Sequence, residues 1–197
     1  MKLPLSLIAC SLAFSAFYSY ATTESFSATV KVQNSVVLTK GNDLNFGTIR
    51  AVADPSGAAQ AVLTINPEPD ASPVSTRTDA SPAIISIIEQ GSPASFTVSE
   101  AVPNARLSIT DPTANTLASD GQGLNEPNFI VDEWKYFITS GPNANAYYLP
   151  GSPNLTADAD GSVEFNIGAN LSTSNSASSE PYRDVEYTGT FQLEVAY

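Results

Sequence analysis

The stretch Tyr187-Thr188-Gly189-Thr190-Phe191-Gln192-Leu193-Glu194-Val195-Ala196-Tyr197 (187–197) decides the fold class. Every second residue falls on the same side of an extended chain, and this period of two predicts a half-buried β-strand. The side chains expected on the core face are Tyr187, Gly189, Phe191, Leu193, Val195 and Tyr197. We expect one continuous closing core strand, with no carboxy-terminal membrane helix, sorting tail or lipid-anchor signal after it.

Similar patterns recur along the chain between loops rich in Pro, Ser, Asn and Gly, and no segment has the periodicity of an amphipathic helix. Residues 83–88 (AIISII) are uniformly apolar and are predicted to form a strand buried on both faces. Near Asp132-Glu133-Trp134 we expect a short helical turn before a strand that begins at Tyr136. Together these patterns predict an all-β antiparallel sandwich. The strands are expected at 22–33, 36–39, 44–49, 59–65, 83–88, 94–98, 107–109, 136–139, 163–167 and 187–197.

Residues 1–21 have the features of a secretory signal peptide: Lys2, an apolar run, and Ser19-Tyr20-Ala21 as a cleavage site. Leu7-Ile8-Ala9-Cys10 also matches a lipobox, but the apolar run before Cys10 is very short, so we favour the signal peptide. The expected division is a signal peptide (1–21), an amino-terminal segment (22–35) and one β-sandwich domain (36–197).

Composition excludes several functions of the exported chain. Removal of residues 1–21 takes away the only cysteine, and the sequence has no histidine. Disulfides, thiolate or histidine metal sites and Ser-His or Cys-His nucleophile pairs are therefore excluded. Loss of Lys2 leaves 8 − 1 = 7 basic against 20 acidic residues, a net charge of −13, which disfavours nucleic acid and anionic membranes as partners. We expect no enzyme, no cofactor and no transmembrane segment.

Three local features have alternative interpretations. Asp158-Ala159-Asp160-Gly161 could begin a calcium loop, but Glu164 comes too early to close one, and a turn is favoured. Asp132-Glu133 is the densest carboxylate pair, but neighbours in a strand point to opposite faces. Four aromatic residues could stack on sugars, although packing is favoured for them. They are Trp134, Tyr147, Tyr148 and Tyr182.

The segment 22–33 (TTESFSATVKVQ) alternates in the same way as the closing stretch. Its apolar face consists of Phe26, Ala28, Val30 and Val32. Such a segment suits either a first strand in its own sheet or a strand donated to a neighbouring subunit, with Asn34-Ser35 as the hinge.

Three motifs occur in order: L-N-F-G-T-I at 44–49, F-N-I-G-A-N-L at 165–171 and Y-T-G-T-F-Q-L-E-V-A-Y at 187–197. They resemble a family of exported bacterial proteins known as a domain of unknown function. That family is similar to archaic chaperone-usher fimbrial subunits, in which an amino-terminal strand precedes an immunoglobulin-like sandwich. The resemblance implies that residues 22–33 are the donor strand.

The expected function is a structural subunit of an extracellular fimbria-like fibre that acts in adhesion or biofilm formation. Its expected partners are identical or similar subunits arranged head to tail, a periplasmic chaperone and an outer-membrane usher, and it would reach the cell surface through the periplasm. The alternative is a monomeric secreted or surface-associated β-sandwich that binds a glycan or a protein.

Overall fold

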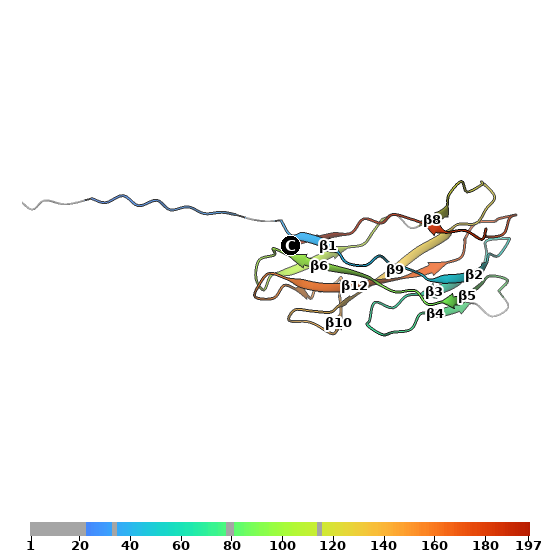
Figure 1. Cartoon of the computed structure of the whole chain (residues 1–197), viewed down its shortest axis with the longest axis horizontal. Coiled ribbons are helices and arrows are strands. Elements are labelled where there is room, and N and C mark those ends of the chain that lie inside the picture. Colours follow the sequence, from blue (N-terminus) through green and yellow to red (C-terminus); the bar gives the residue numbers. More distant parts are fainter. Residues whose placement is uncertain (1–22, 33–34, 78–80, 114–115) are drawn as a thin grey trace, which may run out of the picture. The chain divides into compact units, whose positions relative to one another are not determined.

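The computed structural model describes residues 23–32, 35–77, 81–113 and 116–197, and the chain forms two units, Met1–Gln33 and Asn34–Tyr197. In the first unit, residues 23–32 belong to no strand or helix, and each of them is exposed (Figure 1). Over these residues the strand expected at 22–33 is not formed in the single chain, because a strand is stable only when its main chain has a hydrogen-bonding partner. The predicted signal peptide, residues 1–21, lies outside the described residues.

The second unit is an antiparallel β-sandwich, so the predicted all-β fold class is confirmed (Figure 1). Its larger sheet has nine strands. Six follow the order β1-β6-β12-β9-β8-β13, and three lie off this path: β10 pairs with β9, β3 pairs with β12, and β4 pairs with β3. The strands of this sheet are β1 (Val37–Lys40), β3 (Ala61–Thr64), β4 (Val74–Arg77), β6 (Ala94–Ser99), β8 (Thr116–Ser119), β9 (Phe129–Ile138), β10 (Ala146–Tyr147), β12 (Val163–Ser172) and β13 (Tyr187–Thr188).

Two smaller sheets complete the fold. One has the order β11-β7-β14, and the other pairs β2 with β5. Their strands are β2 (Thr48–Val52), β5 (Ile84–Glu89), β7 (Arg106–Thr110), β11 (Leu155–Thr156) and β14 (Glu194–Ala196). No helix in the described part of the chain is long and apolar enough to cross a membrane.

The strand β12 organises the core because it pairs with β6, β9 and β3 along its ten residues. Phe165 on this strand is fully buried. Its ring stacks on Phe96 of β6 at a centroid distance of 5.8 Å and meets the edge of Tyr136 of β9 at 6.3 Å. These contacts fix the inner faces of three adjacent strands against one another.

Two hydrophobic clusters fill the interior, and both draw on β9 and β12. The first, called here the terminal cluster, also includes residues of β6, β7 and β11. The second also includes residues of β3 and β5. The buried members of the terminal cluster are Ala94, Val98, Ala101, Leu107, Ile109, Tyr136, Ile138, Tyr148, Leu155, Ala157, Val163, Phe165 and Ile167.

The predicted helical turn at Asp132-Glu133-Trp134 is wrong: the chain stays in β9 and forms a β-bulge there. Glu133 has a left-handed backbone with φ of 52°, and the register with β12 shifts at this point. The additional residue changes which side chains face inward. Val131 is buried before the bulge and Tyr136 after it, whereas half-buried Trp134 packs against both clusters.

The apolar run 83–88 is not buried on both faces, contrary to the prediction. Residues 84–88 lie in β5, where Ile85 and half-buried Ile87 pack in the second cluster and Ser86 between them is exposed, so only one face lies on the core. Ile85 is buried, whereas Ile88 is 64% exposed. The sequence pattern also did not predict the short strands β4, β8, β10 and β11, which lie in stretches rich in turn-forming residues.

The loop before β3 is held by the carboxylate of Asp54. Its oxygens accept hydrogen bonds from the main-chain N–H of Ser56 and of Ala59, each at 2.9 Å, and from the Ser56 hydroxyl. The bonds from Ser56 lower the pKa of Asp54 below its usual value.

A lowered carboxylate pKa makes this loop sensitive to acid. The unfolded chain binds the proton more readily, so the stabilisation by Asp54 is present above the unfolded pKa of about 3.9 and is lost as the pH falls through the lower folded pKa. We expect Asp54→Asn to be less stable than the wild type at about pH 7 and closer to it at about pH 3. Urea unfolding of both proteins at the two pH values checks this, and a difference that does not change with pH would contradict it.

Candidate strand-acceptor site

The strands β1 and β14 each have an open edge. Among the described residues, β1 pairs only with β6, at one end of the larger sheet, and β14 pairs only with β7 in the three-stranded sheet. The other edge of each strand presents main-chain N–H and C=O groups that another strand could pair with.

Both open edges pack against the same core. Four apolar side chains at these edges are half-buried against the terminal cluster. They are Val36 just before β1, Leu38 in β1, Leu193 just before β14 and Val195 in β14. Buried residues of β6 and β7, such as Val98 and Leu107, are by contrast fully covered. The apolar side chains at the two edges are therefore in place but incompletely covered.

The two edges run in opposite directions. The hydroxyl of Tyr197, just after β14, accepts a hydrogen bond of 2.9 Å from the N–H of Val102. Val102 lies three residues after Ser99, the last residue of β6, and Ser99 pairs with Val37 at the start of β1. The strand β14 therefore ends at the end of the sandwich where β1 begins, as Figure 1 shows. A strand placed between them would run parallel to one and antiparallel to the other.

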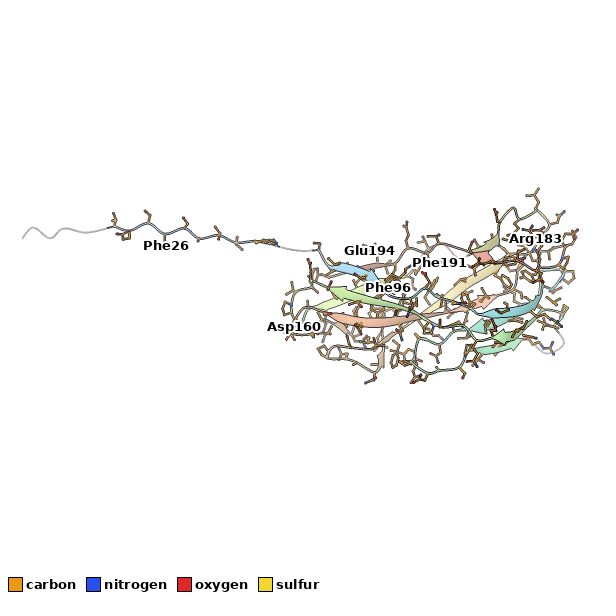
Figure 2. The ribbon with its side chains drawn as sticks, in the orientation of Figure 1. Phe26, Phe96, Asp160, Arg183, Phe191 and Glu194 are labelled. Atoms are coloured by element: carbon orange, nitrogen blue, oxygen red, sulfur yellow. The ribbon has the colours of Figure 1, made fainter. Side chains whose placement is uncertain are left out.

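The chain that leads into β14 is anchored on the bulge of β9. The ring of Phe191 meets that of Trp134 edge-on, with centroids 5.1 Å apart. Figure 2 shows Phe191 and Glu194 along this part of the chain, with Phe96 on β6. Within the three-stranded sheet, Val195 pairs with Ile109, and the Ser108 hydroxyl donates to the carbonyl of Ala196 at 3.2 Å.

The predicted closing strand is divided into two short strands. Tyr187 and Thr188 form β13 on β8 in the larger sheet, whereas Glu194–Ala196 form β14 on β7 in the smaller one. A single continuous strand is not formed because the chain crosses from one sheet to the other. The alternation persists, but these side chains are half-buried or exposed rather than in the core. Tyr187, Phe191, Leu193 and Val195 are half-buried, and Gly189 and Tyr197 are exposed.

The side chains of the predicted donor strand are uncovered in the single chain. Phe26 is 92% exposed (Figure 2). Val30 is 87% exposed and Val32 72%, and Ala28 is also exposed. Their role as a donor strand stays a prediction.

The stretch Asp158–Gly161 forms a turn. The Asp158 carboxylate accepts hydrogen bonds from the N–H groups of Asp160 at 2.9 Å and Ser162 at 2.8 Å, and Gly161 has φ of +76°. These bonds point the carboxylate at the main chain of its own turn. In the part of the chain that the structure describes, no group of three or more acidic, histidine or cysteine side chains could hold a metal ion.

The carboxylates of Asp132 and Glu133 are both exposed at the bulge. Partial burial and the neighbouring charge of Glu133 raise the pKa of Asp132. Burial is the larger of these two causes, and the like charge of Glu133 is the smaller.

Each of the four candidate sugar-stacking aromatics has a packing partner. Tyr148 is buried, and its hydroxyl accepts a hydrogen bond from the N–H of Ile109 at 2.9 Å. Tyr147 lies edge-on to Phe137 at 5.2 Å, and Tyr182 stacks on Phe129 at 4.2 Å. Trp134 packs on Phe191, as described above.

The sequence pattern predicts a strand at 36–39 but does not identify Val36, Leu38 or Trp134 as part of this site. The pattern does not show which edge of a strand remains open. That information lies in pairings between distant segments, such as β1 with β6 and β14 with β7.

Comparisons with known proteins give one match. A profile of the family described as "Domain of unknown function (DUF4402)" matches residues 36–197. No curated protein and no solved structure matches the chain. Because the matched region covers most of the chain and includes the whole described sandwich, this protein belongs to the DUF4402 family.

Proposed function

We propose that this protein is the structural subunit of an extracellular fibre, in which residues 22–33 of one copy pair with the open edges of β1 and β14 in the next copy. The observation that carries the proposal is that these two edges lie against one incompletely covered core. A donated strand would complete both hydrogen-bonded edges and cover that core at once.

The donor segment has the required side-chain pattern. Phe26, Ala28, Val30 and Val32 alternate on one face and are exposed in the single chain. Full burial of a Phe or Val side chain contributes about 1.5–3 kcal/mol, and strand pairing adds main-chain hydrogen bonds. These terms are large enough to hold two subunits together without a covalent bond.

The geometry of such a contact produces a filament. The donor segment and the acceptor edges are different parts of one chain, so the contact is head to tail and does not close on itself. Before assembly, the open edges would be liable to aggregate unless another protein covered them. A periplasmic chaperone and an outer-membrane usher are the partners we propose for this step, with adhesion or biofilm cohesion at the cell surface as the outcome.

Cysteine cross-linking between two different variants tests the contact directly. The chain has one cysteine, Cys10, within the predicted signal peptide, so the exported protein offers no competing thiol. One variant carries Val30→Cys, and the other carries a cysteine at one acceptor position, tested in turn at Val36, Leu38, Leu193 and Val195. A disulfide requires Cα atoms within about 7 Å, as in adjacent strands.

We expect Val30→Cys to form an intermolecular disulfide with at least one acceptor variant when the two are co-assembled. Thr29→Cys is the matched control, because Thr29 lies on the opposite face of the same segment. Non-reducing gels measure the product. No dimer with any acceptor position, or equal cross-linking by the Thr29 variant, would contradict the proposed contact.

A further inference from the structure

A polar recess of about 320 Å³ lies between two loops of the second unit, one before β9 and one after β12. The first loop contributes Gln122, Glu126 and Asn128, and the second contributes the hydroxyl-bearing residues Ser174 and Ser176. This volume is at the lower end of the range for small-molecule sites. The recess shares no residue with the acceptor edges.

The first loop is held in place by its own side chains. The Gln122 amide donates to the carbonyl of Glu126 at 3.0 Å, and the Glu126 carboxylate accepts from the N–H of Gly123 at 3.1 Å. The guanidinium of Arg183 lies 3.1 Å from that carboxylate and donates to the Ser119 hydroxyl at 2.6 Å. The Glu126 charge is thereby offset by a cation.

The two loops are joined by the hydroxyl of Tyr182. It accepts a hydrogen bond from the N–H of Ser174 at 2.9 Å and donates to the carbonyl of Asn128 at 3.0 Å. Burial raises the pKa of Tyr182, so this hydroxyl keeps its proton at neutral pH. The recess is therefore formed before any ligand arrives.

One atom of the first loop has an unmet hydrogen-bonding requirement. The side-chain oxygen of Gln122 is buried and has no hydrogen-bond partner in the structure. The amide nitrogen of the same side chain is bound to Glu126, which fixes the orientation of the group. A buried acceptor without a donor costs about 1–3 kcal/mol, but this oxygen has almost no accessible surface, so a ligand reaches it only when the Gln122 side chain moves.

The chemistry of the walls defines the ligand class. Hydroxyl, amide and charge-balanced carboxylate groups suit a ligand with many hydroxyls, and the walls offer no uncompensated cation for an anion. Leu124, whose side chain is fully exposed at the rim, supplies an apolar surface. We propose that this recess binds a neutral carbohydrate, independently of strand donation.

Direct binding of neutral oligosaccharides to the full exported chain tests this proposal. The probes are lactose, maltotriose and chitotriose, and the measurement is saturation-transfer NMR followed by a titration. We expect at least one probe to bind with a dissociation constant of about 1 mM. No binding of any of the three at about 10 mM would overturn the proposal.

A pair of tryptophan variants locates the binding. Ala177 lines the recess and is exposed, so Ala177→Trp should fill the recess without unfolding the protein. Ala159→Trp is the matched control in the exposed turn beside Asp160, which Figure 2 shows at the opposite end of the second unit from Arg183. We expect the first variant to weaken binding at least about tenfold and the second to leave it unchanged. Equal binding by Ala177→Trp and wild type would overturn the assignment, and thermal unfolding verifies that both variants are folded.

Discussion

Replacement of Val30 by aspartate is expected to abolish polymerisation and to leave the second unit folded. Val30 is 87% exposed in the single chain, so the new charge costs nothing there. In the proposed fibre the same side chain is buried against the terminal cluster of the next subunit. An unpaired carboxylate in such a place costs several kcal/mol, which exceeds what one buried valine contributes.

The matched control for this prediction is Thr29→Asp. Thr29 has the same neighbours in sequence but lies on the other face of the segment, so its aspartate would point away from the core of the next subunit. Filament yield by electron microscopy and the ladder on unheated denaturing gels measure both variants. Filaments of normal yield from Val30→Asp, or equal loss in both variants, would argue against a donated strand in which Val30 faces the core.

Replacement of Gly168 by valine is expected to prevent folding of the sandwich. Gly168 lies in the middle of β12, and a Cβ atom there would collide with the carbonyl oxygen of Ile65 and the ring of Pro67. The neighbouring N–H of Ile65 donates to the carbonyl of Ala169 at 2.9 Å, so the two chains cannot separate without losing this hydrogen bond. We expect a loss of more than about 4 kcal/mol in the free energy of unfolding.

Gly151→Ala is the control for this prediction, because a Cβ atom at Gly151 meets nothing within 4 Å. It should change the free energy of unfolding by less than about 0.5 kcal/mol. Soluble yield and urea unfolding measure both variants. A Gly168→Val protein that unfolds cooperatively within about 1 kcal/mol of the wild type would show that β12 tolerates separation from the chain after β3.

The glycines of the three sequence motifs explain why the sequence predicted the fold better than the function. Gly47, Gly168 and Gly189 each lie against a main-chain carbonyl that leaves no room for a side chain. These carbonyls belong to Glu89, Ile65 and Thr116. The motifs therefore encode close approaches of the backbone within the sandwich, and a resemblance based on them carries information about packing rather than chemistry.

Other parts of the fold depend on contacts that a local pattern does not contain. The alternation in 163–167 was sufficient to predict the first half of β12, because one face there lies on the core and the other is open, with Phe165 buried and Glu164 exposed. The bulge at Glu133 was not predicted, since its effect is to bury residues on both sides of it, Val131 in the second cluster and Tyr136 in the terminal cluster. The division of 187–197 follows from the position of β7 and β8 in different sheets.

The acceptor site could be predicted only in part for the same reason. The half-buried state of Leu193 and Val195 depends on the open edge of β14, and that edge is defined by pairings between residues far apart in the chain. The donor face of Phe26 and Val30 is a local pattern and was visible in the sequence. A local pattern shows which side chains are available, whereas the surface that receives them is created only by folding.

The most direct test of strand donation is negative-stain electron microscopy of the exported wild-type protein, combined with gels of unheated and boiled samples. Strand donation predicts thin filaments and a ladder of bands that boiling converts to a single monomer band. A lone monomer band without filaments, even on co-expression with a chaperone and usher, would contradict strand donation and favour a monomeric binding module.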